Sequence, residues 1–340
     1  MTGRRQPDAR IAVIGTGSFA ATLVKAILAD RQCRAEIYLI GRSERSIRRA
    51  VTRAAARSPR VVHEIVLPLG PDADLTTCLQ AVRPHLVVVC ASLFSPYGTG
   101  DIPPPGGGFA TSMLLQAPIA VRAAEAVAKL ADRPCLVNAC YPDAVNPLLA
   151  ALNLPVQFGV GNVQTLEAGL ALRDVRIVAH HRHLKPVPAA EEAQIWAPNP
   201  QCRRDELNLL RRWDRQRLNE LGATAAGQLL AALVRGETVH TNLPGPAGLP
   251  GGYPVRVNLE HCEPDLPDGL TLEQAVTTNR RHCAAEGVEV AHGEIRFTGD
   301  AAQWLDRWGV VPGGALPVHD WAQAMRKLVA VSAGQGVGVR

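Results

Sequence analysis

The hydrophobic pattern of the first half of the chain alternates between short, mainly apolar runs and segments with helical spacing. In the helical segments apolar side chains recur as they do along one face of an amphipathic helix. Short apolar runs are typical of parallel strands that are buried on both faces of a sheet. They lie at residues 10–14, 35–40, 61–67, 86–91, 135–138 and 156–161. This alternation predicts an α/β domain with a doubly wound, six-stranded parallel sheet.

The pattern changes after residue 161, where strands and helices no longer alternate. Helical spacing occurs at residues 165–172, 203–221, 223–235, 271–285 and 319–331. Strand-like runs occur at 175–179, 239–243 and 253–259, and a hairpin pattern at 287–298. This mixture predicts an α+β domain. We therefore expect a first domain at residues 1–161, a second at 162–332 and a frayed tail at 333–340.

A glycine-rich turn follows the first predicted strand and leads directly into a helix. It reads Gly15-Thr16-Gly17-Ser18-Phe19-Ala20. Gly15 permits a tight turn, Gly17 lets backbone N–H groups approach a pyrophosphate, and Ala20 allows close packing of helix on strand. The phosphates would lie at the positive end of the helix. The turn thus predicts a Rossmann dinucleotide-binding domain, and a purely structural turn is the alternative.

The end of the second strand bears on the choice of cofactor. An NAD site commonly has an acidic residue here that accepts from the ribose hydroxyl, whereas a 2′-phosphate needs donors and positive charge. This chain has Gly41, Arg42, Ser43, Glu44, Arg45 and Ser46. The composition favours NADP(H). The alternative is that the arginines belong to an exposed helix start, and Glu44 leaves that alternative open.

Composition and charge exclude several classes of protein. Of the 340 residues, 47% are apolar and 20% charged, as in ordinary globular proteins. No uninterrupted apolar run is long enough to span a membrane, and residues 1–8 lack the apolar core of a signal peptide, so we expect a cytoplasmic protein. The basic segments have no interleaved aromatic residues, which argues against nucleic-acid binding. Eight scattered cysteines without a Cys-x-x-Cys pair indicate free thiols.

A cluster of histidines supplies candidate chemistry. His180, His181 and His183 follow the predicted strand at 175–179. Hydride transfer to or from a carbonyl or imine needs a group that exchanges one proton beside the reacting carbon, and histidine suits this task. If the strand continued, His181 and His183 would share one face and His180 would lie on the other. We expect His181 to be the acid/base and His183 to be the next candidate; a metal site and an exposed polar strand end are the alternatives.

The segment at residues 92–108 is too rich in glycine and proline to be helix or strand. It follows Ala91 at the end of the fourth strand, where ligands of such sheets bind, so we expect it to be a lid. An exposed surface excursion is the alternative. The segment contains Asp101 but no Arg or Lys, which predicts a substrate that carries little negative charge.

The order of these landmarks resembles the lactate and malate dehydrogenase superfamily over about residues 10–310. Gln116-Ala-Pro-Ile119 is similar to the start of the helix after the family's substrate loop, and Gly159-Val-Gly161 to its Gly-x-Gly turn. The segment from Gly41 to Ser46 resembles the Gly-Ser-Glu-Arg-Ser of the NADP-dependent malate dehydrogenases, which is the most specific match.

The resemblance implies an NADP(H)-dependent oxidoreductase that acts on a small molecule as a homodimer or homotetramer. By position, Asn138 would contact substrate and cofactor, and Glu167 would pair with the catalytic histidine. The cofactor site would comprise Gly15, Thr16, Gly17, Ser18, Phe19, Gly41, Arg42, Ser43, Arg45, Ser46, Ala91 and Asn138.

This chain departs from the family at the positions where the family binds its substrate. The loop at 92–108 lacks the family's arginines, and no Arg occupies the clamp position after Gly161. We therefore expect a carbonyl, alcohol or imine substrate other than lactate or malate, in specialised biosynthesis. The segments at 141–146 and 158–162 are also similar to NAD-dependent glycosidases, although no Cys stands in that turn. The alternatives are thus a redox-cycling, glycosidase-like lyase or hydrolase, and a catalytically silent nucleotide-binding sensor.

Overall fold

The computed structural model describes residues 9–55, 58, 60–68, 74–94, 107–170, 174–197 and 203–334. Its centre is a six-stranded sheet in the order β3-β2-β1-β4-β5-β6, with every pairing parallel. The strands are β1 (Arg10–Ile14), β2 (Glu36–Gly41), β3 (Val62–Val66), β4 (Leu86–Val89), β5 (Cys135–Asn138) and β6 (Phe158–Gly159). The predicted sheet is confirmed. Because the strand order reverses between β1 and β4, a crevice opens at their carboxyl ends.

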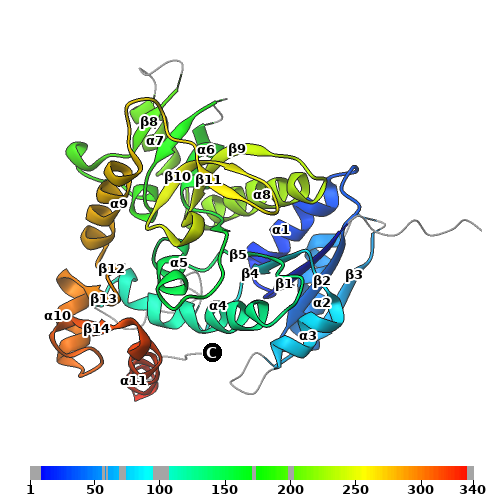
Figure 1. Ribbon diagram of the computed structural model, residues 1–340, viewed down its shortest axis with the longest axis horizontal. Coiled ribbons are helices and arrows are strands. Elements are labelled where there is room, and N and C mark those ends of the chain that lie inside the picture. The colour runs from blue at the N-terminus through cyan, green and yellow to red at the C-terminus, as the bar shows by residue number, and fades with distance from the viewer. Residues whose placement is uncertain are drawn as a thin grey trace, which may run out of the picture.

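Helices cover both faces of this sheet (Figure 1). They are α1 (Ser18–Ala29), α2 (Glu44–Ala55), α3 (Leu75–Val82), α4 (Met113–Ala128) and α5 (Pro142–Ala151). The strands pack on helices on each side, so β1 and β4 are almost wholly buried. Each fully buried Ile or Leu contributes roughly 1.5–3 kcal/mol to stability. The apolar runs of the sequence therefore form the core of the domain.

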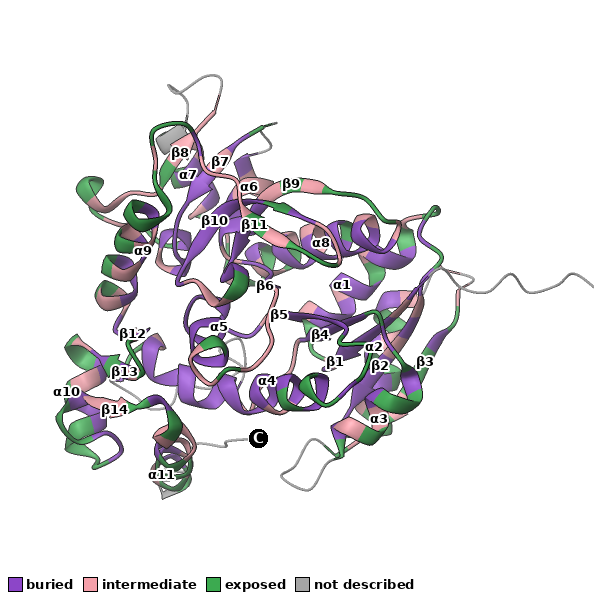
Figure 2. Ribbon diagram, viewed as in Figure 1, coloured by how far each residue is buried: buried purple, intermediate pink, exposed green. Residues whose placement is uncertain are grey.

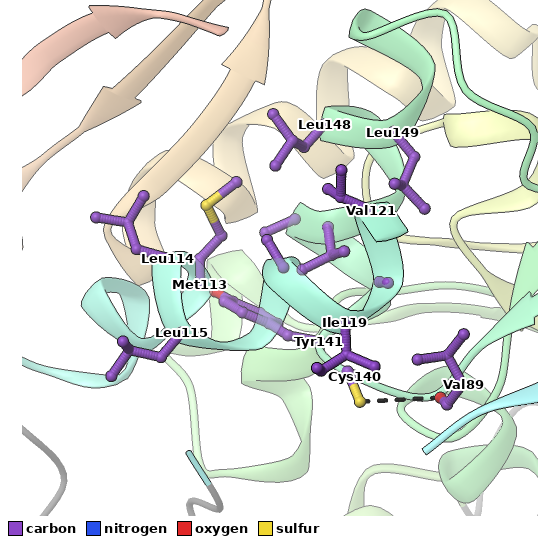
Figure 3. Close-up of a cluster of buried hydrophobic side chains, with 14 of the residues drawn as sticks. Val89, Met113, Leu114, Leu115, Ile119, Val121, Cys140, Tyr141, Leu148 and Leu149 are labelled. Carbon is purple, nitrogen blue, oxygen red and sulfur yellow. Dashed lines mark hydrogen bonds between the residues drawn. The ribbon is translucent and has the colours of Figure 1, made fainter. Parts of the chain in front are cut away.

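Helix α4 is buried along most of its length (Figure 2). It lies between the sheet and the C-terminal part of the chain, which explains why it is apolar on more than one side. Figure 3 shows its side chains Met113, Leu114 and Ile119 in the cluster that also holds Cys140 and Tyr141. This packing fixes the position of Cys140 and Tyr141, which stand immediately before α5 and belong to the candidate site.

The second half begins with α6 (Val163–Leu170), β7 (Arg176–Val178), β8 (Gln194–Trp196), α7 (Arg203–Leu210) and α8 (Arg215–Val234). The helices expected at 203–221 and 223–235 were wrongly divided. The break falls instead at Asp214, whose side chain caps α8 by accepting from the N–H of Arg217 at 2.8 Å. Helix α8 then packs on α1 at Gly227, where a Cβ would collide with the carbonyl oxygen of Leu23.

The remaining elements are β9 (Val239–Pro244), β10 (Gly252–Val257), β11 (Cys262–Pro264), α9 (Leu272–Glu286), β12 (Val288–Ala291), β13 (Glu294–Phe297), α10 (Gly299–Arg307), β14 (Ala315–Pro317) and α11 (Trp321–Gly334). Two antiparallel sheets form, in the orders β11-β10-β9 and β12-β13-β14. The second sheet and α11 pack beside α5 and α4 (Figure 1). Helix α10 was not predicted. None of the described helices is long and apolar enough to cross a membrane. The domain boundaries stay a prediction.

Candidate active site

An open cavity of about 910 Å³ lies at the carboxyl ends of the central strands. Its walls come from the β1–α1 turn, the segments after β2, β4, β5 and β6, a short 3-10 helix at His181–Leu184, and the first turn of α8. The first half of the chain and the second half therefore contribute to one site. The described part of its lining holds four arginines and a histidine but no carboxylate.

The glycine-rich turn forms one end of this cavity, with Gly15, Thr16, Gly17, Ser18 and Phe19 in its lining. Gly15 has φ +125°, and a Cβ there would meet the backbone of Cys90 and Ala91 at 2.7–2.9 Å. A Cβ on Gly17 would meet nothing within 4 Å, and no side chain caps the N-terminus of α1. The first N–H groups of α1 thus face space in which an anion would fit, as a dinucleotide pyrophosphate requires.

A basic stripe continues the site from Gly41 along α2. Arg42, Ser46, Arg49 and Arg53 all line the cavity. Arg42 precedes α2, and the spacing of the other three places them on one side of the helix. Ser43 and Arg45, which were expected here, do not line it. The backbone N–H of Ser46 donates weakly to the Ser43 hydroxyl at 3.4 Å, and the Arg45 side chain is exposed. Arg49 and Arg53 were missed, although the helical period counted from Arg42 reaches both.

His181 lies at the other end of the cavity, almost fully buried. Its Nδ1 is 2.8 Å from Oε1 of Glu286, and its Nε2 is 2.6 Å from Nη2 of Arg215. An arginine can only donate, so Nε2 accepts and Nδ1 carries the proton that is donated to Glu286. The ring of Phe109 stacks on the imidazole with centroids 4.4 Å apart. These contacts hold the ring with Nε2 toward Arg215.

Glu286 is the last residue of α9, and its side chain is only 7% exposed. Its Oε2 also accepts a hydrogen bond of 3.0 Å from the Tyr141 hydroxyl. Burial acts to raise the pKa of Glu286, but His181, His180 and Tyr141 together hold it well below its usual range. The carboxylate is therefore ionised and is suited to hold the His181 imidazole and to stabilise its protonated form.

The other two histidines of the cluster have structural contacts. The strand ends before them, so the expected alternation of faces is wrong: His180 caps the 3-10 helix and accepts from the N–H of Arg182 at 3.3 Å. Both ring nitrogens of His183 bond to the main chain, Nδ1 to the N–H of His180 and Nε2 to the carbonyl of Glu191. Burial lowers the pKa of His180 to about 3 and lowers that of His183, so both are neutral. His183 does not line the cavity.

Two further expectations are corrected by the structure. Asn138 is fully buried, and its side chain bonds to Cys140 and Asn146 instead of reaching the cavity. Glu167 does not approach His181. It accepts from the Thr241 hydroxyl at 2.6 Å and from the N–H of Asn242 at 2.9 Å, which fixes α6 to β9.

Arg215, the first residue of α8, brings a guanidinium to the substrate end. The sequence predicted a substrate end without arginine, because none stands in the loop or after Gly161. The structure supplies one from a different element. Of the expected lid, residues 95–106 lie outside the described residues, while Ser92 and Leu93 line the cavity. In the described part of the chain no three His, Cys, Asp or Glu side chains are arranged to hold a metal ion.

The comparisons with known proteins give structural matches only. No protein-family model and no curated protein sequence matches the chain. A malate dehydrogenase from Plasmodium falciparum in complex with NADH superposes with a TM-score of 0.54 and 12% identity, covering 82% of this chain and 96% of that one. A lactate dehydrogenase from Cryptosporidium parvum gives 0.51 and 17%, covering 82% and 97%.

A lactate dehydrogenase from Eimeria maxima with NADH and oxamate gives a TM-score of 0.50 and 12% identity, covering 83% of this chain and 94% of that one. None of these three structures is a glycosidase, so the similarity to that family has no support from them. At such low identity the agreement concerns the course of the backbone. The chain has the fold of the lactate and malate dehydrogenases.

Proposed function

We propose that this protein is an NADP(H)-dependent oxidoreductase that transfers a hydride to or from a carbonyl, alcohol or imine carbon of a small metabolite. One observation carries the proposal: a buried histidine–carboxylate pair, His181–Glu286, opens into the same cavity as the glycine-rich turn. A proton-exchanging group beside a dinucleotide cradle is the arrangement that hydride transfer needs.

The cofactor end supports a nicotinamide dinucleotide. The turn from Gly15 to Phe19 would hold the pyrophosphate, and Ala91 lines the wall between this turn and the substrate end. Arg42, Ser46 and Arg49 would bind a 2′-phosphate, since they supply donors and charge and the described lining has no competing carboxylate. When bound, the cofactor supplies or accepts the hydride.

His181 performs the proton step in this proposal. In the structure Nε2 accepts from Arg215, so the proton step requires the guanidinium to turn from Nε2 to the anionic group of the substrate. In reduction, protonated His181 then gives the proton on Nε2 to the substrate oxygen; in oxidation, neutral His181 takes it back. Glu286 keeps Nδ1 protonated and stabilises the imidazolium, because its carboxylate lies 2.8 Å from that nitrogen in a buried place. Phe109 restricts rotation of the ring.

Arg215 narrows the class of substrate. Its guanidinium touches the nitrogen that exchanges the proton, so an anion bound by Arg215 would be a close neighbour of the reacting oxygen. The substrate end otherwise presents apolar groups such as Leu184 and Leu218, together with amide side chains. We infer a carbonyl compound with a single anionic group beside the carbonyl carbon and an uncharged substituent, which disfavours the doubly charged malate.

The test combines cofactor binding with turnover. NADPH and NADH are titrated against the protein, and a panel of carbonyl compounds with and without an adjacent carboxylate is screened for NADPH oxidation. We expect tighter binding of NADPH and turnover that is abolished in His181→Gln but unchanged in His319→Gln, whose side chain is exposed away from the cavity. Equal affinity for NADH would contradict the NADP(H) assignment. Bound NADPH without any turnover would favour a sensor.

A further inference from the structure

The start of α5 connects three walls of the candidate site that are far apart in the sequence. Tyr141, at the N-cap, donates to Glu286. Asp143, two residues later, accepts at Oδ1 from the backbone N–H of His181 at 3.0 Å. Its other oxygen, Oδ2, accepts from the side-chain amide of Asn162. Asp143 itself is 1% exposed and does not line the cavity.

From these contacts we infer that Asp143 is a positioning residue that holds the backbone of His181 and the side chain of Asn162 at a fixed separation at the substrate end. The inference rests on the proposed function of this cavity. A carboxylate without a proton can only accept, so both of its neighbours must turn a donor toward it. His181 can do so only with its backbone, because its imidazole is held by Glu286 and Arg215.

The contact also fixes which end of the Asn162 amide faces a ligand. Nδ2 gives one of its two N–H groups to Asp143, and Asn162 lines the cavity, so its carbonyl oxygen Oδ1 is the acceptor that the amide offers there. Asn162 has φ +47°, a backbone conformation that Asn and Asp tolerate better than most residues. The site therefore offers the amide oxygen of Asn162 as an acceptor, which suits a ligand group that donates a hydrogen bond.

A reciprocal exchange of the two side chains tests this role. In Asp143→Asn, Oδ1 still accepts from the N–H of His181, but Nδ2 opposes the amide nitrogen of Asn162. The double variant D143N/N162D restores a donor–acceptor pair, keeps one carboxylate in the pair and leaves an acceptor facing the cavity. The measurements are kcat, KM and NADPH affinity of wild type, both single variants and the double variant, together with their unfolding equilibria in urea.

For D143N we expect kcat to fall about 10- to 100-fold with NADPH affinity within about twofold of wild type, since Asp143 acts at the substrate end. The double variant should regain at least tenfold in kcat. Unchanged kcat in D143N, or a double variant no faster than D143N while equally stable, overturns the inference. If the wild-type protein turns over no carbonyl, the proposed function fails. The contact is then tested by the urea unfolding of the variants alone. If the effects of the two single variants on the free energy of unfolding simply add up in the double variant, the contact is overturned. A coupling of at least fivefold in the unfolding equilibrium constant supports it.

Discussion

His181 and Glu286 meet at 2.8 Å although 105 positions separate them in the chain. One residue begins a 3-10 helix after β7, and the other ends α9. Both residues belong to the second half of the chain, but His181 faces a cavity built mainly at the parallel sheet of the first half. The candidate site, rather than the pair itself, therefore needs both halves of the chain to be folded together.

Replacing Glu286 by Gln should remove the charge that stabilises protonated His181. Because burial leaves no water to take its place, we expect kcat to fall by about 10²- to 10⁴-fold, the range typical of general acid–base catalysis. The matched control is Glu167→Gln, which changes a half-buried glutamate that contacts Thr241 and Asn242 instead. Steady-state NADPH oxidation measures both. An equal fall in kcat in the two variants would contradict the proposal that Glu286 stabilises protonated His181.

The variant Arg215→Gln should lower the activity on anionic substrates more than the activity on neutral ones. Hydrogen bonds to charged groups contribute about 1.5–3 kcal/mol, so kcat/KM for a carbonyl compound with an adjacent carboxylate should fall about 10- to 100-fold. A neutral carbonyl compound should lose much less. Arg217→Gln is the control, since Arg217 stacks on Trp213 at 3.6 Å and does not line the cavity. A uniform loss for charged and neutral substrates would contradict the assignment of Arg215 to the anion.

The basic stripe on α2 predicts a selective effect on cofactor affinity. In the double variant R42Q/R49Q the lining loses the two arginines assigned to the 2′-phosphate, so NADPH should bind about tenfold more weakly or worse, while NADH binding should change little. Arg45→Gln, on the same helix but outside the lining, should leave both affinities unchanged. Fluorescence titration with the two cofactors measures this. Parallel weakening of NADPH and NADH would show that the arginines do not bind the 2′-phosphate.

The features that the sequence predicted well are those with a local signal. The strands are short apolar runs, and the glycine-rich turn needs only its own residues and the elements on each side. Part of the basic stripe has such a signal too: Arg42 and Ser46 were expected, whereas Arg49 and Arg53 follow from the helical period, which was not applied beyond Ser46. Asp214 is a similar case, because an N-cap residue marked the start of α8.

No local pattern in the sequence indicates that Glu286 is the partner of His181. Glu167 was chosen because it lies near the family's position in the sequence, but two donors on β9 hold it elsewhere. Glu286 is one of many acidic residues on amphipathic helices, and only the packing of α9 against the start of α5 brings it to the site. Arg215 likewise lies in the segment 203–221, for which the sequence predicted a helix and no role in the site. Long-range contacts of this kind are set by tertiary packing rather than by spacing in the chain.

Buried His180 predicts how stability depends on pH. Burial lowers its pKa to about 3, against the opposing effect of Glu286, while the unfolded chain has the ordinary value of 6.5. Between these values the unfolded state binds more protons, so the stabilising contribution is present above pH 6.5 and is lost as the pH falls toward 3. At pH 5 the loss from this group is roughly 2 kcal/mol relative to neutral pH.

The variant His180→Asn keeps an acceptor for the N–H of Arg182 but cannot titrate. Its unfolding free energy should therefore fall less between pH 7.5 and pH 5 than that of the wild type, by about 2 kcal/mol, even if the variant is less stable at neutral pH. Urea unfolding at both pH values measures the difference, and His319→Asn, at an exposed histidine, should follow the wild-type profile. Asp143 is common to all three proteins, and Glu286 remains ionised over this range, because His181 and Tyr141 also hold its pKa well below the usual range. Identical pH profiles for H180N and wild type would mean that His180 is not the buried neutral group on which this prediction depends.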